Sequence, residues 1–328
     1  MNKKRNLIIF RHFKKEYGGS QNAIFSLMNS LNSFFYILAW DGLFIYKNGK
    51  FKAISFTFFT TKPNRFRFFV VQTFNPLNLF LIFCKEQCYF LPKGSTSIYE
   101  FCKFKGFVKK IYFYVFEYLL LKRCYWIYNS YAELKNSLCQ NHKNIIFISE
   151  IINYSNNKLI SVRHKEYKHT LAIIGDFYFV KGQDRVNDFI QNNSNLDIKR
   201  VIFVGSIRPG YEEWANKIIK QLSQKFEVQH YEKMSRKNLW DFIYKNSSNV
   251  LICSRSESFS YVAIEALNFG LETFVSNKIG VSELNLPLST FSFSDMKVNR
   301  RQIPLLDNNL VTEHNTEVLS AYKKLFDV

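Results

Sequence analysis

The sequence predicts an α/β protein built from two halves, each a largely parallel sheet covered by helices. Its 328 residues suit two domains of about 100–200 residues each. Hydrophobic residues make up 47% of the chain and charged residues 22%, a composition that can bury two cores and excludes a disordered chain. Short β-branched or aromatic runs alternate with segments of helical period, which is typical of parallel sheets covered on both faces.

The first half has the less regular pattern. We expect a helix at 20–31, where Ala23, Leu27 and Leu31 share one face, and a long helix at 108–122. Asn48-Gly49 lies between two apolar runs and indicates a β-hairpin. Strands are expected at residues 6–10, 35–39, 43–46, 51–54, 68–72, 88–91 and 126–128.

The second half alternates strands and helices more cleanly. An Asn-rich stretch at 153–168 has little pattern and indicates a linker. We therefore expect an N-terminal domain at 1–160 and a C-terminal domain at 161–328, both Rossmann-like. A last helix is expected at 316–326. Strands of the second half are expected at residues 169–174, 200–204, 226–230, 250–253 and 273–275, with helices between them.

Positive charge is concentrated in the first half. Residues 1–160 hold 23 lysines and arginines against 7 acids, a net charge of +16, whereas residues 161–328 hold 22 against 19, a net charge of +3. One half is therefore expected to meet an anionic partner. Nucleic acid, an anionic membrane surface and a phosphorylated acceptor all remain open on charge alone.

The cysteines and the apolar stretches predict the compartment. None of the six cysteines forms a CxxC pair or a zinc-spaced cluster, so we expect free thiols and no metal. The apolar start is too short for a signal peptide. The longest apolar stretch, 111–121, includes Glu117 and falls short of the ~20 residues that span a bilayer. We expect a cytoplasmic protein.

Two glutamates bracket the start of a predicted helix after the strand at 250–253. Backbone N–H groups near Ser260, Tyr261 and Val262 would have no acceptor within the helix and would form an anion seat. Glu257 and Glu265 on its two sides suit the hydroxyl groups that flank the diphosphate of a nucleotide sugar. The plainer alternative is that Glu257 interacts with the helix dipole and Glu265 is a solvated helix residue.

The surrounding residues favour the first interpretation. The sequence from Ser254 to Gly270, with the Gly280-Val-Ser-Glu283 stretch that follows, resembles the donor-site signature of the retaining glycosyltransferases of family four, also called group 1 glycosyltransferases. The match covers about thirty residues. The resemblance implies the GT-B architecture, in which two Rossmann-like domains face each other across a cleft and a C-terminal helix closes back.

A second segment of the resemblance is Gly175-Asp176, followed by Lys181-Gly182. Lys181 takes the place of the phosphate-binding lysine of the family, but Asp176 stands where the family usually carries an arginine. Either Arg208 or Arg255 substitutes as a donor-binding cation, or activity is weakened. An ordinary surface lysine is the alternative for Lys181.

The resemblance also assigns roles to the other residues. Lys181 and the N–H groups near residues 260–262 would hold the diphosphate, Glu265 the ribose and Glu257 the sugar. The loop at Gly18 and Gly19 would face the donor and the acceptor, with a plain loop as the alternative.

The implied reaction moves a hexosyl unit from a nucleotide diphosphate sugar to the hydroxyl of a lipid-linked or saccharide acceptor, with retention of configuration. The resemblance implies no metal and no other cofactor, so cations and helix N-termini stabilise the leaving diphosphate. The abundance of Phe, Lys, Asn, Ile and Tyr fits an AT-rich bacterial gene of the kind found in surface-polysaccharide clusters, which make O-antigen, capsule or lipopolysaccharide.

The basic first half suggests where the acceptor lies. Apolar residues flanked by lysines at 101–123 suit a segment in the headgroup layer of an anionic membrane, which would place the protein on the inner face of the cytoplasmic membrane. The alternative is a helix buried nearly all round at 111–121. The turn around Lys93 resembles, weakly, a turn on the acceptor side of some family members.

Three other functions are open. An epimerase of the same architecture would need an acid/base set that the sequence does not offer. A transferase-like protein that binds without turnover is favoured by Asp176. A nucleic-acid-binding protein is favoured by the net charge of +19, but no RNP motif, helix-turn-helix or zinc finger occurs, so we expect no nucleic-acid partner.

Overall fold

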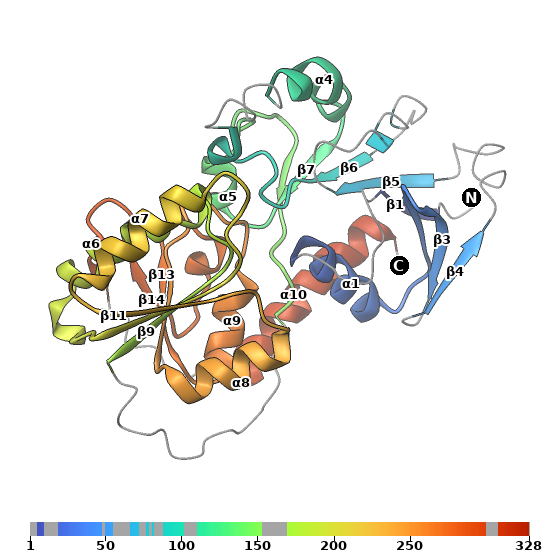
Figure 1. Cartoon of the computed structure of the whole chain (residues 1–328). Coiled ribbons are helices and arrows are strands. Elements are labelled where there is room, and N and C mark those ends of the chain that lie inside the picture. The colour runs from blue at the N-terminus through green and yellow to red at the C-terminus, as the bar shows by residue number, and fades with distance from the viewer. Residues whose placement is uncertain are drawn as a thin grey trace. The chain divides into compact units, whose positions relative to one another are not determined.

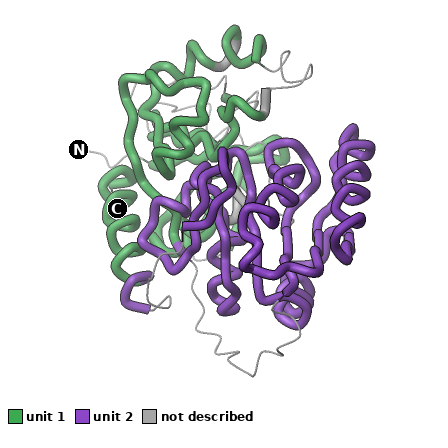
Figure 2. The backbone as a smooth tube through the Cα atoms, turned by 90° about the vertical axis from the view of Figure 1, so that its left-hand side faces the viewer, with its two compact units in different colours: residues 1–151, 312–328 green, residues 152–311 purple. Residues whose placement is uncertain are grey.

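The chain forms two compact units. The computed structural model describes residues 5–9, 19–47, 50–54, 66–71, 77–78, 81, 88–101, 110–152, 169–299 and 308–327. One unit comprises residues 1–151 and 312–328, and the other comprises residues 152–311 (Figure 2). The expected boundary at 160/161 and the linker at 153–168 lie outside the described residues. None of the described helices is long and apolar enough to cross a membrane.

The first unit contains an eight-stranded sheet (Figure 1). Its strands run in the order β4-β3-β2-β1-β5-β6-β7-β8. Neighbouring strands pair in parallel except β2 with β3 and β3 with β4, which pair antiparallel, so β3 alone runs opposite to the rest. The strands are β1 (Arg5–Ile9), β2 (Phe35–Ala39), β3 (Gly42–Lys47), β4 (Lys50–Ile54), β5 (Phe66–Val71), β6 (Cys88–Leu91), β7 (Tyr125–Tyr128) and β8 (Ile145–Phe147).

Helices cover both faces of this sheet. On one face, α1 (Gly19–Leu31) and α10 (Asn308–Phe326) share an apolar core with β1 and β2. Asn6 in β1 donates a hydrogen bond to the Phe326 carbonyl at 3.0 Å, which fastens the C-terminal helix to the first unit as expected. On the other face, residues 110–121 form a continuous helix of π-helical Phe113–Glu117 and α4 (Tyr118–Leu121).

The sheet of the second unit has seven strands in the order β11-β10-β9-β12-β13-β14-β15. All pairs are parallel except β14 with β15. The strands are β9 (Thr170–Ile174), β10 (Arg200–Val204), β11 (Glu227–Tyr231), β12 (Asn249–Ile252), β13 (Glu272–Ser276), β14 (Ser289–Phe291) and β15 (Val298–Asn299). The five strands expected in this half are therefore present.

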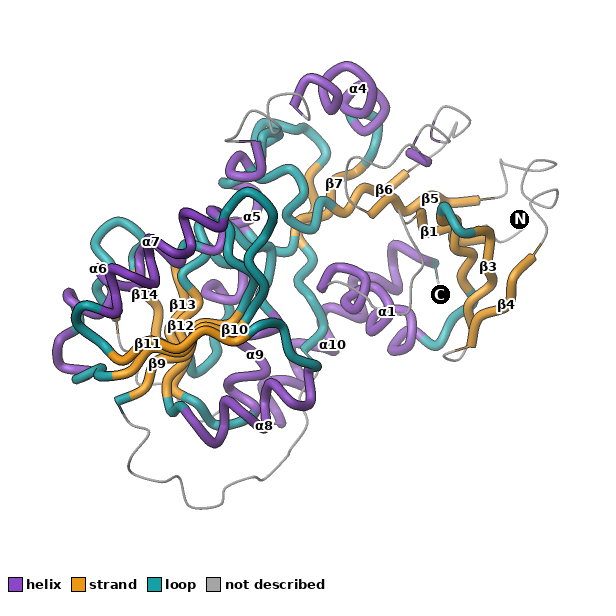
Figure 3. Tube along the Cα trace, in the orientation of Figure 1, coloured by secondary structure: helices purple, strands orange, loops and turns teal. Residues whose placement is uncertain are grey.

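The central strand β9 separates two cores. Leu171 and Ile173 point to α6 (Val186–Asn192) and α7 (Glu212–Ser223), whereas Ala172 points to α8 (Arg236–Asn246) and α9 (Tyr261–Asn268). Figure 3 shows α6 and α7 on one face of the sheet and α8 and α9 on the other. This is the doubly wound α/β arrangement that the alternating sequence pattern predicts.

The order of the strands reverses at β9. The chain first adds β10 and β11 on one side of β9, and then returns to place β12, β13 and β14 on the other. In such sheets, ligands bind beyond the carboxyl ends of the strands at this switch point. The loops that follow β9 and β12 are therefore the first place to look for a site.

Candidate active site

The loop after β9 lies close to the end of β12, and a glycine, Gly182, allows this close approach. Gly182 has a φ of +70°, and a Cβ atom there would lie 2.0 Å from the carbonyl oxygen of Cys253. Only a residue without a side chain allows this approach. The short 3₁₀ turn Phe179–Lys181 therefore ends with Lys181 beside the loop that follows β12.

Lys181 and Glu257 meet across the switch point. Lys181 Nζ lies 3.1 Å from Glu257 Oε2, and the two side chains are 25% and 20% exposed. Burial acts to lower the pKa of Lys181, but the adjacent Glu257 carboxylate outweighs it and the pKa is raised above its ordinary value. The ammonium therefore stays charged at neutral pH while part of it remains open to solvent.

Ser254 fixes the carboxylate of that pair. Its hydroxyl donates to Glu257 Oε2 at 3.1 Å, and the residue is 1% exposed. The backbone of the next stretch is also held, because Gly280 N–H donates to the Glu257 carbonyl and Val281 N–H to the Phe259 carbonyl. The site thus has a fixed anionic group supported on two sides.

The N-terminus of α9 follows directly. Ser260 precedes the helix with a φ of +92°, a left-handed conformation that costs a non-glycine residue energy and is commonest at functional sites. Its hydroxyl is buried and has no hydrogen-bond partner among the described residues. Tyr261 and Val262 form the first turn of the helix, where the dipole and the N–H groups favour an anion.

Glu265 lies one turn further along α9, against α8. Its carboxylate accepts hydrogen bonds from the Arg236 guanidinium and from the Trp240 indole N–H. The side chain is 15% exposed, whereas that of Arg236 is 59% exposed. The structure therefore holds Glu265 in place, and a ligand hydroxyl can reach its carboxylate by displacing the exposed guanidinium of Arg236.

Two arginines were expected as alternative cations, and the structure separates them. Arg208 is half-exposed, lies over the ring of Tyr178 at 3.5 Å and approaches Asp176 Oδ2 to 3.5 Å. Arg255 is 8% exposed; it donates to both carboxylate oxygens of Asp184 and to the Phe179 carbonyl. Its charge is thus committed to bracing the Lys181 loop, which does not support the expected contact of Arg255 with an anion.

The glycine loop of the first half belongs to the other unit and is only partly described. Gly18 lies outside the described residues, and Gly19 is the first residue of α1 in the first unit. Lys93, in the turn that was compared with an acceptor-side turn, is a buried residue of the first unit. Its ammonium lies 2.6 Å from Glu150 Oε1 and donates to Asn129, so it holds the fold of that unit together.

The long helix of the first unit is buried on one side only. Phe113 and Leu121 are fully buried, but Ile111 is 50% exposed, Val115 55% and Leu119 65%. The interpretation of a helix buried nearly all round is therefore wrong for residues 110–121. The sequence could not reveal this, because apolar residues surround the helix and only the packed sheet shows which of them are covered.

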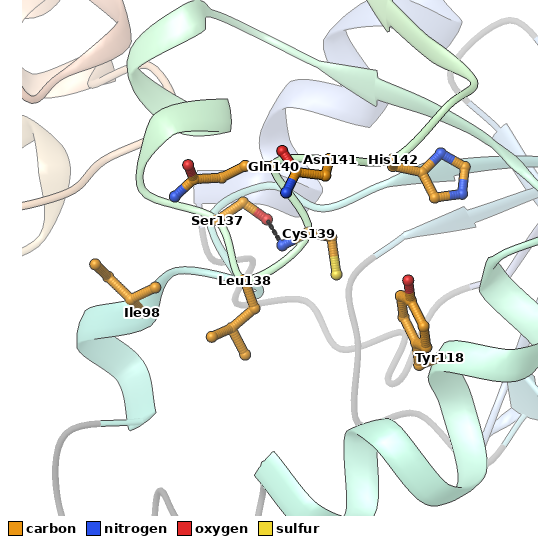
Figure 4. A pocket seen from close by; sticks show the side chains of 8 residues that line it. All are labelled: Ile98, Tyr118, Ser137, Leu138, Cys139, Gln140, Asn141 and His142. Atoms are coloured by element: carbon orange, nitrogen blue, oxygen red, sulfur yellow. Dashed lines mark hydrogen bonds between the residues drawn. The ribbon is translucent and has the colours of Figure 1, made fainter.

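A pocket of about 380 Å³ opens beside that helix (Figure 4). Tyr118 and Leu138 form apolar walls, and the thiol of Cys139 points between them. His142 stacks on Trp126 and engages two backbone groups; burial lowers its pKa, so it is neutral at physiological pH. Ser137 and Gln140 also have hydrogen-bond partners within the unit, and the lining residues include no lysine, arginine or carboxylate like those of the β9–β12 site.

Several residues of the site were missed from the sequence. Asp184, Arg236 and Trp240 contact the expected residues but carry no motif of their own, and Ser254 begins the donor-site signature without a role of its own there. Asp184 and Arg255 are 71 residues apart along the chain, and their pairing depends on the parallel pairing of β9 with β12. The signal that could have found Ser254 is its place three residues before Glu257, at the carboxyl end of a predicted strand.

Residues 156–293 match the family described as Glycosyl transferases group 1. No curated protein gives a significant match. Among solved structures, sucrose-phosphate synthase of Thermosynechococcus elongatus aligns with a TM-score of 0.62 and 13% identity, over 97% of this chain and 90% of that chain. The HepE protein of Anabaena, in complex with UDP and glucose, aligns with a TM-score of 0.52 and 12% identity, over 98% and 94% of the chains. WaaG, a glycosyltransferase involved in lipopolysaccharide biosynthesis, aligns with a TM-score of 0.53 and 11% identity, over 98% and 95%. At these identities, the likeness to solved structures shows the fold.

Proposed function

We propose that the protein is a retaining glycosyltransferase, because residues 156–293 match the glycosyl transferases group 1 family and the chain has a GT-B fold. It transfers a hexosyl unit from a nucleotide diphosphate sugar to the hydroxyl of a lipid-linked or saccharide acceptor. The observation that carries the proposal is the Lys181–Glu257 pair at 3.1 Å, placed at the switch point of the sheet and directly before the N-terminus of α9.

In this proposal, cations and backbone dipoles stabilise the leaving diphosphate. Lys181 supplies a point charge, and the first turn of α9 around Tyr261 and Val262 supplies N–H groups and the helix dipole. Charge develops on the diphosphate as the bond to the sugar breaks, so these groups bind the transition state more tightly than the ground state. The strained, buried Ser260 offers a hydroxyl to the same anion.

The two glutamates orient the ends of the donor. Glu257 is held by Ser254 and accepts hydrogen bonds from the sugar, while Lys181 turns from Glu257 to the phosphate when the donor binds. Glu265 accepts from the ribose hydroxyls after Arg236 moves aside. We expect the donor's own phosphate oxygen to take the proton of the acceptor, and we expect activity to be unchanged by EDTA.

The donor and acceptor classes follow from comparison and from charge. HepE was solved with UDP and glucose, which supports a uridine nucleotide as the first donor to test. WaaG acts in lipopolysaccharide biosynthesis, which supports an acceptor of surface-polysaccharide synthesis. We assign the acceptor to the basic N-terminal domain, at 1–160, and the donor to the C-terminal domain, at 161–328.

The exposed face of the 110–121 helix supports a membrane partner. Ile111, Val115 and Leu119 follow one another at helical spacing and are each at least half exposed, and Lys122 and Arg123 follow the helix with exposed side chains. An apolar stripe beside cations suits insertion at the headgroup level of an anionic bilayer. The protein would then act as a peripheral enzyme on the inner face of the cytoplasmic membrane.

A nucleotide screen tests the donor site. Thermal unfolding is measured with UDP, GDP, ADP, CMP and their sugars, for the wild type, Glu265→Ala and a matched control, Glu213→Ala, which removes an exposed glutamate from α7. One nucleotide should stabilise the wild type and Glu213→Ala but have a much smaller effect on Glu265→Ala. If no nucleotide stabilises the wild type, the donor site is absent and the proposed function fails.

A second candidate is a transferase-like protein that binds a nucleotide sugar without turnover. Asp176 favours it, because an acid near a diphosphate repels it. A nucleotide sugar that stabilises the protein but is never cleaved to release its nucleotide would identify this case.

A further inference from the structure

Two neighbouring loops of the second unit are locked together just beyond β9 and β10. Phe177 forms a parallel bridge with Ile207, Phe177 N–H donates to the Ser206 carbonyl at 2.9 Å, and Arg208 N–H donates to the Phe177 carbonyl at 3.2 Å. A Cβ atom on Gly205 would lie 2.3 Å from the Gly175 carbonyl oxygen. The backbones at residues 176 and 208 therefore keep a fixed relation.

The side chains of Asp176 and Arg208 meet on this support. Asp176 Oδ2 is 3.5 Å from Arg208 Nε, and the guanidinium carbon lies 3.5 Å from the ring centre of Tyr178. Both side chains remain accessible, with 39% of Asp176 and 45% of Arg208 exposed. No other ion pair or hydrogen bond of this guanidinium is found within the described parts of the chain, so its terminal nitrogens are available to a ligand.

This guanidinium lies in the neighbourhood of Lys181. The stem of Lys181 passes 3.6 Å from the position of a Gly175 Cβ, directly before Asp176. Arg208 also exerts a positive potential on the Lys181 ammonium, which opposes its protonation. Two cations, Lys181 and Arg208, are therefore gathered beyond the end of β9.

A diphosphate requires more charge than Lys181 alone provides. Lys181 is shared with Glu257, and Arg255 is buried in its pair with Asp184. We propose that Asp176 positions Arg208 as the second cation of the diphosphate site, so that an acid and an arginine from two loops supply the charge that an arginine at residue 176 would supply. This inference rests on the proposed nucleotide-sugar site and adds Asp176 to it as a positioning residue.

In this proposal Asp176 orients Arg208, and Arg208 binds the phosphate. The Tyr178 ring and the Asp176 carboxylate hold the planar guanidinium at its face and at Nε. The two terminal nitrogens then point a bidentate edge at phosphate oxygens. In this arrangement Asp176 does not repel the diphosphate, because the adjacent Arg208 already neutralises its negative charge.

Isothermal titration with pyrophosphate, UDP, GDP and ADP tests the inference, with the parent nucleosides as a comparison. The variants are Arg208→Ala, Asp176→Asn, the relocated double variant Asp176→Arg/Arg208→Ala, and Arg200→Ala. The last removes an arginine paired with Glu227 on the same loop-bearing strand β10 and serves as the matched control.

Arg208→Ala should weaken binding of pyrophosphate and of the preferred nucleoside diphosphate by about 10- to 100-fold, the range of charge-assisted hydrogen bonds. The affinity for the parent nucleoside should not change. A variant that had lost its fold would bind the nucleoside more weakly as well. Asp176→Asn should weaken binding by about two- to fivefold, as for an exposed ion pair. The double variant should recover about tenfold of what Arg208→Ala loses.

Three results would overturn the inference while leaving the donor site intact. These are Arg208→Ala binding as tightly as Arg200→Ala, Asp176→Asn binding diphosphates more tightly than the wild type, and no recovery in the double variant. A wild type that binds none of the diphosphates is a different outcome, because it removes the proposed function and this inference with it.

Discussion

Lys181 and Glu257 come from loops that follow two different strands, and their side chains pair at 3.1 Å across the point where the strand order of the second sheet reverses. Neither side chain is fully buried; Ser254 donates a hydrogen bond to the Glu257 carboxylate, and the stem of Lys181 passes beside Gly175. We expect this pair to separate when a donor binds, because a diphosphate offers Lys181 more negative charge than a single carboxylate does.

Removing either member of this pair should lower transfer. Lys181→Met keeps the stem along Gly175 but removes the charge, and we expect kcat to fall by about 10²–10³-fold, as when one group of an electrostatic site is lost. Glu257→Gln should lower kcat/KM with a smaller effect on binding of the free nucleoside diphosphate. Steady-state kinetics beside Lys220→Ala, an exposed lysine of α7, provide the check. A Lys181→Met enzyme as fast as that control would exclude Lys181 from the reaction.

The close approach of the Lys181 loop to β12 can be tested with two glycines. Gly182→Ala places a Cβ atom 2.0 Å from the Cys253 carbonyl oxygen, whereas Gly210→Ala meets nothing within 4 Å, although both glycines have positive φ. Gly210→Ala should cost about 1–2 kcal/mol from backbone strain, and Gly182→Ala clearly more. Urea unfolding of the two variants measures the difference. Equal losses would show that the loop is not pressed against the strand.

A buried acid of the first unit predicts a pH dependence of stability. Burial raises the pKa of Glu133 to about 7, against the hydrogen bonds that Asn129 and Gly94 donate to its carboxylate. The folded state therefore holds this proton more tightly than the unfolded state. The stabilisation is complete below the ordinary pKa of 4.5 and is lost as pH rises towards 7, by up to about 3 kcal/mol.

Glu133→Gln cannot titrate and isolates this contribution. The free energy of unfolding of the wild type, measured from pH 4.5 to 8, should fall relative to that of Glu133→Gln as pH rises. The gap between the two curves should close or reverse near pH 7. Two parallel curves over this range would contradict the raised pKa.

The exposed stripe of the 110–121 helix predicts binding to anionic membranes. Val115→Asp and Leu119→Asp together should reduce sedimentation with vesicles of anionic lipid by at least about tenfold, because each places a charge where an apolar residue would enter the bilayer. The matched control replaces Phe34, a 44% exposed apolar residue outside this helix, with aspartate. Equal, negligible binding of the wild type to anionic and neutral vesicles would remove the membrane partner.

The strands of the second half could be predicted because buried parallel strands carry continuous apolar runs, as at residues 200–204 and 250–253. The lengths of the short elements could not be predicted from the sequence. Strand β8 and helix α5 (Tyr131–Lys135) have too few residues for a period to emerge, and α10 begins at Asn308, eight residues before the expected start, because polar residues open it.

The contacts of the candidate site depended on tertiary structure. Lys181 and Glu257 were chosen from their places after strands, but their approach requires that β9 and β12 be neighbours, which strand order alone decides. Arg255 shows the limit most clearly. The sequence offers it as an available cation, whereas in the fold its planar group is enclosed by Asp184 and Phe179.

The central claim is that the β9–β12 site breaks the bond between a sugar and a nucleoside diphosphate. Release of the nucleoside diphosphate from a panel of UDP-, GDP- and ADP-sugars, in the presence of membrane lipid extract, tests it most directly. The account predicts release from one donor by the wild type, undiminished by EDTA and reduced at least about 100-fold in Lys181→Met. A donor that stabilises the wild type but yields no more nucleoside diphosphate than Lys181→Met would contradict it.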